Sequence, residues 1–404
     1  MKIFKYFLFT IFLRKLPILI STTVLIFLSH FATFTAARSI FSTIEGKHQL
    51  AYLDKKGTYI ANMDPKSSFD SDFITLDKLN AVYTFLNNYH YAFHVDGFVA
   101  DIPNNNGMEV TLTYYNKNYS NMVHFPISEG NLPSFDTTFN QEIPVTIGKG
   151  LSENYPLGST LTINDPSLDT SSTFKVKGIL EKDVSHPNFY APHSHEYYNF
   201  SLLVPITDEY LTKASEDLKL NGLMDLIIYD CDTQKINELE NFLYEELHIH
   251  FHFYSHEENI HDFNENYIST LKIVAIIAGS LTVLILFLGV WNIIMEVRTA
   301  IKDITINMLI GLSPSRLRTI FYTFHFLLFG CILFIFFIAT AYSRHELWTE
   351  KNAAFATYGT FGLISADWFS LLTVAIIHIP IIIAIVETAL WRTRKMPISL
   401  GVLQ

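Results

Sequence analysis

The stretch "IVAIIAGSLTVLILFLGVWNIIM" (Ile273–Met295) contains no Asp, Glu, Lys or Arg. About 20 predominantly apolar residues are enough for a helix to cross the hydrocarbon core of a bilayer, so this stretch predicts a transmembrane helix. Three more stretches share its length and apolar character: Leu16–Ala37, Thr319–Ser343 and Trp368–Trp391. Four such lengths favour a membrane protein with four transmembrane helices over a soluble protein with a very apolar core.

The first apolar stretch could also belong to a signal peptide. Its apolar core is longer than the roughly 7–15 residues usual in signal peptides, and it lacks the usual cleavage site with small residues. We therefore expect Leu16–Ala37 to be a retained membrane anchor.

Basic residues predict the orientation of the chain. Residues 1–15 carry four Lys or Arg and no acid, residues 392–404 carry three and no acid, and residues 296–318 carry four against two acids. By the positive-inside rule these three segments are cytoplasmic. We therefore expect both termini in the cytoplasm and a large domain outside the membrane.

The expected organisation follows from the spans and the charges. Its segments are a cytoplasmic N-terminal segment (1–15), transmembrane helix 1 (16–37), an extracytoplasmic domain (38–266), a stalk with transmembrane helix 2 (267–295), a cytoplasmic helix and loop (296–318), transmembrane helix 3 (319–343), an outer loop (344–367), transmembrane helix 4 (368–391) and a cytoplasmic tail (392–404).

The net charge of −11 is unevenly distributed. Residues 39–266 contain 33 acidic and 13 basic residues, whereas the rest of the chain contains 6 acidic and 15 basic residues. An acidic outer domain argues against nucleic acid as a partner and fits either a cationic ligand or a solvated acidic surface. The two cysteines are Cys231 in the expected outer domain and Cys331 in an expected span. Because of these separate places, we expect no disulfide bond between them.

Alternating apolar residues predict an α+β fold for the outer domain. "LMDLIIYDCDTQKINELENFLYEELHIHFHFYS" (residues 223–255) has the pattern of a strand, a helix and a strand. The other expected strands are Gln49–Leu53, Tyr91–Val99, Glu109–Tyr115, Pro144–Ile147, Thr160–Ile163, Phe174–Leu180 and Leu202–Ile206, and the other expected helices are Leu76–Tyr89 and Asp208–Leu218.

The sequence "HIHFHF" (residues 248–253) presents a candidate metal site. On a strand His248, His250 and His252 would share one face, and imidazole suits zinc or copper. The alternative is a half-buried strand whose histidine face is solvated. Neighbouring residues on one face of a strand are about 6.5–7 Å apart, so three of them rarely converge on one ion, and the solvated face is the favoured interpretation.

The chain carries no recognised catalytic motif. There is no phosphate-binding G-x-x-x-x-G-K-[ST] loop and no G-x-S-x-G, H-E-x-x-H or C-x-x-C motif, so we expect no catalytic residues and no ATP hydrolysis by this chain. Polar residues inside the predicted spans include His325 and Glu387. We expect His325 to make interhelical hydrogen bonds and Glu387 to reach the surface or pair with Arg394 or a neighbouring chain.

The loop after the second span has an unusual composition for a turn at a membrane surface. "DITINMLIGLSPSRLR" (residues 303–318) places apolar residues beside charged ones, then breaks at Gly311, Ser313 and Pro314. An ordinary basic turn between spans does not require apolar residues facing water. The pattern therefore predicts a short helix whose apolar end contacts another protein.

The order of these features resembles the permease subunits of MacB/FtsX-type (type VII, mechanotransmission) ABC transporters. Within "SEGNLPSFDTTFNQEIPVTIGKGLSENYPLGSTLTINDPSLDTSSTFKVKGIL" (residues 128–180), an E-G turn, an apolar strand ending in Gly, an L-G-x-x-L segment and a closing F-x-V-x-G-I-L follow the family's progression. The opening "KIFKYFLFTIFLRK" and the closing "RTRKMPISLGVL" resemble the family's interfacial helix and basic tail. The loop resembles its E-I-G-I-L-[RK]-A-[LI]-G-A-S pattern, with departures at Thr305, Asn307 and Met308.

The resemblance implies a function and partners. The coupling residues would be Asp303, Ile304, Ile306, Met308, Leu309, Ile310, Gly311, Leu312 and Ser313. They would bind a cytoplasmic ABC ATPase dimer, which holds the ATP and Mg, while this chain holds no cofactor. A second permease copy or a related permease would complete the complex, and an extracytoplasmic accessory protein could join it. The resemblance also implies the bacterial cytoplasmic or inner membrane as the location. Export of, or resistance to, an amphiphilic peptide, antibiotic or lipid-linked substrate is favoured. The alternatives are an FtsX-like regulator of a cell-wall hydrolase or signalling partner, and a lipoprotein-release permease.

Overall fold

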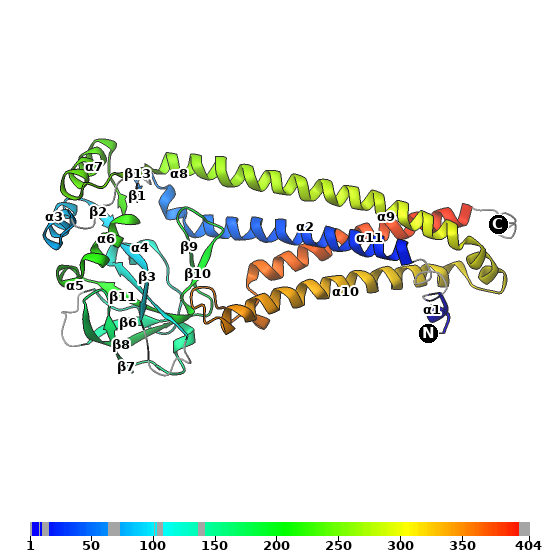
Figure 1. Ribbon diagram of the computed structural model, residues 1–404, viewed down its shortest axis with the longest axis horizontal. Coiled ribbons are helices and arrows are strands. Elements are labelled where there is room, and N and C mark those ends of the chain that lie inside the picture. Colours follow the sequence, from blue (N-terminus) through cyan, green and yellow to red (C-terminus); the bar gives the residue numbers. More distant parts are fainter. Residues whose placement is uncertain are drawn as a thin grey trace. The chain divides into compact units, whose positions relative to one another are not determined.

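The computed structural model describes residues 2–7, 9, 16–63, 73–100, 102, 108–135 and 142–395 (Figure 1). The chain forms two compact units. The membrane-helix unit comprises Met1–Phe41, Ser269–Tyr342 and Ser365–Gln404, and the α+β unit comprises Ser42–Ile268 and Ser343–Ile364. The closing "MPISLGVL" and most of residues 8–15 lie outside the described residues.

The described part of the chain has four helices that are long and apolar enough to cross a membrane. They lie in α2 (Leu16–Gln49), α9 (Ser269–Leu309), α10 (Pro314–Thr349) and α11 (Ser365–Lys395). Large apolar side chains such as Ile276 and Phe287 point outward from α9, as expected of a surface in contact with lipid. The predicted fold class, four membrane helices with an α+β region between the first and the second, is confirmed. The protein is a multi-pass membrane protein.

The membrane-helix unit has an apolar core of its own. Phe7 of α1 (Lys2–Phe7) packs in the same cluster as Ile293 and Val297 of α9, Phe321 of α10 and Val386 of α11. Contact between helices inside a membrane depends on such close packing, because lipid tails are as apolar as the side chains. Short helix α1 is therefore part of this packed unit.

The first sheet of the α+β unit has four antiparallel strands in the order β13-β1-β12-β2. These strands are β13 (Phe251–Ser255), β1 (Tyr59–Met63), β12 (Ile227–Tyr229) and β2 (His90–Ala92). Helices α3 (Leu76–Leu86), α6 (Glu216–Met224) and α7 (Thr233–Leu247) share its apolar core.

The second sheet is mixed, with the strand order β3-β4-β11-β6-β8-β5 and β7 paired with β8. Its strands are β3 (His94–Ala100), β4 (Val110–Asn116), β5 (Ile127–Gly130), β6 (Ile143–Ile147), β7 (Thr160–Asp165), β8 (Thr170–Leu180) and β11 (Ser201–Ile206). The β4–β11 and β6–β8 pairs are parallel and the others antiparallel. A separate hairpin joins β9 (Ser185–Pro187) to β10 (His195–Tyr197).

The sequence pattern accounts for the best-predicted elements. In β8, Phe174 and Val176 are buried while Lys175 between them is partly exposed, which is the two-residue period of a strand with one buried face. Helix α7 buries Ile236, Leu239, Leu243 and Leu247, and each fully buried side chain of this size contributes roughly 1.5–3 kcal/mol.

Three expectations about local structure are wrong, each for a local reason. The strand expected at Gln49–Leu53 is the end of α2 followed by a 3₁₀ turn, Ala51–Asp54, because buried Leu50 and Leu53 are three residues apart and fit a helical turn. The helix expected at Asp208–Leu218 is two helices, α5 (Asp208–Lys213) and α6, because Ser215 caps a new helix by accepting a hydrogen bond from the Leu218 amide.

The third difference concerns the strand expected at Tyr91–Val99. The chain changes sheet at Phe93, so that β2 belongs to the first sheet and β3 to the second. Strand β1 belongs to no expected element. Residues between the third and fourth spans also enter the α+β core, where Ala353 and Ala356 are buried and the Tyr197 amide donates to the Ala354 carbonyl at 2.7 Å.

Candidate functional site

The loop after α9 begins with a well-defined helix end. The Leu312 amide donates to the Asn307 carbonyl at 2.9 Å and the Gly311 amide donates to the Met308 carbonyl at 3.1 Å, which is the hydrogen-bond pattern of a Schellman motif. Gly311 has a φ of 104°, a conformation that glycine adopts without a steric cost. The helix therefore stops at a fixed place.

The next helix starts just as sharply. The Ser313 hydroxyl accepts a hydrogen bond from the Arg316 amide at 3.3 Å, and Pro314 occupies the first position of α10. Proline is favoured there because its missing N–H would have no helical partner and its φ suits a helix. The two motifs together hold the short turn between α9 and α10 in one conformation.

The structure divides the predicted coupling residues into an exposed and a buried group. Ile306, Met308, Leu309 and Ile310 are exposed, with Ile310 at 77%. We call these four residues the coupling patch. They lie at the end of a helix of 41 residues, about 60 Å long at 1.5 Å per residue, which is twice the roughly 30 Å of a hydrocarbon core.

Two of the predicted contact residues face the other way. Ile304 and Leu312 are buried within the apolar core of the membrane-helix unit, so they support the loop and do not enlarge its outer surface. Asp303 contributes its backbone carbonyl, which accepts from the Asn307 side chain at 2.7 Å. The loop is also no separate short helix, because α9 is continuous from Ser269 to Leu309.

His325 is part of a polar group inside the membrane-helix unit. A small cavity of about 40 Å³ is lined by His325 together with Ser29, His30, Glu296 and His378. The Ser29 hydroxyl bonds to His378 Nε2, and His325 Nδ1 lies 2.9 Å from the Phe321 carbonyl. The Ser29–His378 bond joins α2 to α11, and bonds of this kind help to hold membrane helices together. The His325 contact with Phe321 is within α10, so the expected interhelical bond of His325 stays a prediction.

Glu387 contacts Arg318 and Tyr322, whereas the side chain of the expected partner Arg394 lies outside the described part of the structure. Glu387 Oε1 lies 2.6 Å from an Arg318 nitrogen and accepts a hydrogen bond from the Tyr322 hydroxyl at 2.7 Å. Both partners belong to the first turns of α10, so the pair connects the start of α10 to α11.

The histidines of "HIHFHF" do not form the expected face of a strand. His248 ends α7 in a left-handed conformation, with φ 56°, and stacks on Phe73. His250 stacks on Tyr244, whereas His252 on β13 is near the carboxylates of Glu240 and Glu258. Strand β13 begins only at Phe251, so the prediction that one strand aligns all three histidines on one face is wrong.

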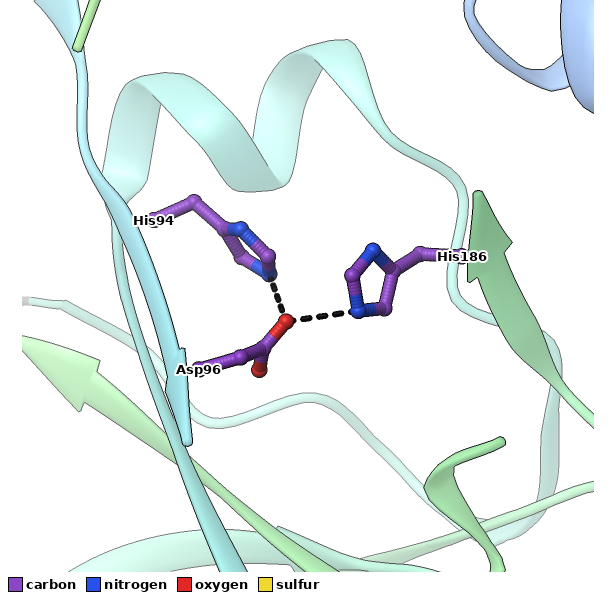
Figure 2. Close-up of side chains that lie close together, drawn as sticks. All are labelled: His94, Asp96 and His186. Atoms are coloured by element: carbon purple, nitrogen blue, oxygen red, sulfur yellow. Dashed lines mark ion pairs between the residues drawn. The ribbon is translucent and has the colours of Figure 1, made fainter. Parts of the chain in front are cut away.

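A group of possible metal ligands lies elsewhere in the α+β unit, as Figure 2 shows. His94 and Asp96 come from β3 and His186 comes from β9. Asp96 Oδ2 is 3.2 Å from His94 Nε2 and 2.6 Å from His186 Nε2. Within the described residues these are the three that could hold a metal ion. One signal for this group was present in the sequence, which was the polar residues of "HVD" (residues 94–96) at the start of an otherwise apolar strand.

No family model matches the sequence, and no curated protein matches it. Among solved structures, the chain is similar to the periplasmic region of MacB from Actinobacillus actinomycetemcomitans, with 14% identity and a TM-score of 0.33 over 55% of this chain and 98% of that one. It is also similar to the extracellular domain of the ABC-type transporter YknZ from Gram-positive bacteria, with 11% identity and a TM-score of 0.31 over 48% of this chain and 98% of that one.

Proposed function

We propose that this chain is the permease subunit of a MacB/FtsX-type ABC transporter and that its coupling patch binds a separate cytoplasmic ATPase. The observation that carries the proposal is the exposure of Ile306, Met308, Leu309 and Ile310 on a loop fixed at both ends. Four large apolar side chains beside charged residues fit a protein contact better than contact with water.

The surroundings of the patch support a position outside the hydrocarbon core. Lys302 and Asp303 precede it, and Arg316 and Arg318 follow it within a few residues. Charged side chains in this density mark the region beyond the bilayer core. An apolar patch that faces water in the free chain gains stability when a partner covers it, by about 25 cal/mol for each Å² buried.

The proposed mechanism is mechanotransmission. ATP binding closes the ATPase dimer, which brings two coupling patches together. Because the loop is held rigidly by its Schellman motif and by the Ser313 cap, the movement passes into α9 and α10 without being lost in a flexible turn. In this account the chain itself hydrolyses no ATP and needs no substrate path through its spans.

The complex would contain two permeases and two ATPase subunits. One chain offers one coupling patch, whereas an ABC ATPase dimer has two equivalent grooves. A twofold homodimer of this chain is therefore the simplest assembly. Export of an amphiphilic substrate is the preferred activity, because the α+β unit has two sheets and offers a large surface outside the spans.

The test is affinity isolation of the tagged full chain from its own cells in detergent. We expect an ATPase with a G-x-x-x-x-G-K-[ST] motif to be isolated with it, in a complex whose mass fits two copies of each subunit. The chain expressed without that subunit should hydrolyse no ATP. A single permease copy in the complex, or ATP hydrolysis by the pure chain, would contradict the proposal.

A further inference from the structure

The cluster of His94, Asp96 and His186 is built around an irregularity in β3. Val95 pairs with Tyr114 and Phe98 pairs with Leu112, so that Asp96 and Gly97 together face the single residue Thr113. This is a β-bulge, a feature that redirects side chains and occurs often beside functional sites. Gly97 has a φ of 95°, which suits glycine, and Thr113 donates a hydrogen bond to Asp96 Oδ1. The bulge and this bond leave Asp96 Oδ2 facing the two imidazoles.

We infer that His94 Nε2, His186 Nε2 and Asp96 Oδ2 form a binding site for a divalent transition-metal ion such as zinc. The three atoms lie within 4.8 Å of one another (Figure 2). Two imidazole nitrogens and one carboxylate oxygen are a ligand set that zinc accepts, with a fourth position open to water or another ligand. This site is independent of the coupling patch.

The distances between the ligand atoms are close to those that zinc requires. Zinc binds nitrogen and oxygen at about 2.0–2.2 Å, so two ligands in a tetrahedral site are about 3.3 Å apart. His94 Nε2 and Asp96 Oδ2 already lie 3.2 Å apart. His186 Nε2 is 2.6 Å from Asp96 Oδ2 and would have to move away by about 0.7 Å to admit the ion.

Further acidic residues surround the same place. A cavity of about 210 Å³ is lined by the three ligands and by Asp225 and Glu196, among others. Glu196 on β10 pairs directly with His186 on β9, so the two side chains are on the same face of the hairpin. None of the residues lining this cavity is Lys or Arg. A divalent cation would neutralise this excess of carboxylates, and either acid could supply the fourth ligand.

Neighbouring rings hold both imidazoles in position. His94 stacks on Tyr119 with the ring centres 4.3 Å apart, and His186 stacks on Tyr198 at 5.1 Å. The Tyr198 hydroxyl also lies 3.2 Å from His94 Nε2 and would turn toward another acceptor when the ion binds. A site whose ligands are already oriented loses less conformational freedom on binding.

The ion would join the β9–β10 hairpin to the second sheet. Within the α+β unit, His195 Nε2 of this hairpin lies 3.2 Å from the Ser42 carbonyl, and the Tyr190 carbonyl accepts from the Tyr267 hydroxyl. Metal binding would therefore fix a hairpin that contacts α2 at Ser42 and the helical residues before α9 at Tyr267.

The test uses the full chain in detergent, stripped with EDTA and titrated with zinc chloride, with bound metal counted after equilibrium dialysis. We expect one zinc ion per chain. Asp96→Asn and His186→Gln should each weaken binding by at least ~100-fold, the upper end of the loss caused by changing a residue outside the ligand set. His252→Gln is the matched control, because His252 also lies near two carboxylates, and it should bind zinc like the wild type.

Two results would overturn the inference. One is the absence of saturable zinc binding by the wild type. The other is full binding by both Asp96→Asn and His186→Gln. If circular dichroism shows that both variants are unfolded, the wild type with cobalt(II) decides. Intense visible absorption typical of four-coordinate cobalt supports the site, and the weak spectrum of six-coordinate cobalt contradicts it.

Discussion

Asp165 and Asp96 are two carboxylates inside the same α+β unit, and their surroundings differ. Asp165 accepts four hydrogen bonds, from the hydroxyls of Tyr114 and Tyr210 and from the amide and hydroxyl of Ser167. Asp96 accepts one from Thr113, and its other oxygen faces two imidazoles at the edge of a cavity. A carboxylate whose acceptor capacity is filled by hydroxyls and amides stabilises the fold, whereas one that is left beside metal-ligating groups is available to bind.

The donors around Asp165 keep their protons. Burial, followed by the charge of Asp165, raises the pKa of Tyr114 and of Tyr210 well above that of a free tyrosine. Both hydroxyls therefore remain donors at neutral pH.

The largest effect should come from Asp165→Ala. This change leaves two tyrosine hydroxyls and the Ser167 groups buried without their acceptor, and each unsatisfied group costs about 1–3 kcal/mol. We expect the α+β unit to lose about 3–5 kcal/mol of stability. Hydrogen–deuterium exchange of the β4 amides in the full chain would measure it. A loss of stability below 1 kcal/mol would show that the hydrogen bonds of Asp165 do not stabilise the fold as the comparison requires.

A smaller effect is expected from Asp96→Ala, and it should depend on zinc. Without metal the change should alter stability by ~1 kcal/mol or less, because the cavity lets water reach the remaining groups. Zinc at about 100 times its dissociation constant should stabilise the wild type by ~2.7 kcal/mol and leave Asp96→Ala unchanged. The same exchange measurement, with and without zinc, compares the two. If zinc stabilised the wild type and Asp96→Ala equally, Asp96 would not be the metal-binding member of the pair Asp96 and Asp165.

The smallest effect concerns the bulge. Gly97→Ala places a Cβ in open space, so the cost is the backbone strain at a φ of 95°, about 1 kcal/mol. Zinc affinity should fall at the same time, because the altered bulge redirects Asp96. Gly158→Ala is the matched control, since Gly158 also has a positive φ and open space but lies outside the cluster. Equal zinc affinity in Gly97→Ala and Gly158→Ala would show that the bulge does not orient the ligand.

The sequence predicted the features that depend on local pattern. The four spans, the helix α7 and the break at Gly311 and Pro314 each follow from residues close together in the chain. The histidines at 248–252 were adjacent in sequence but were separated by the end of α7 at His248.

The metal site could not be found in that way. His94 and Asp96 meet His186 only because the second sheet and the β9–β10 hairpin bring distant segments together, and no spacing in the sequence encodes that contact. The inward direction of Ile304 and Leu312 was likewise decided by packing against other helices, which hydrophobic periodicity alone does not reveal.

The central claim, that the coupling patch binds the ATPase, is tested most directly by Ile310→Asp. Ile310 is exposed on the surface of the described chain, so the change should leave folding and insertion intact. In the complex it would place a charge in an apolar groove, at a cost of several kcal/mol. Leu157→Asp is the control, because Leu157 is an exposed leucine in the α+β unit. The measurement is the amount of ATPase isolated with each tagged chain, together with its rate of ATP hydrolysis. Loss of both in Ile310→Asp, with both retained in Leu157→Asp, is the predicted result; full ATPase binding and hydrolysis in Ile310→Asp would contradict the account.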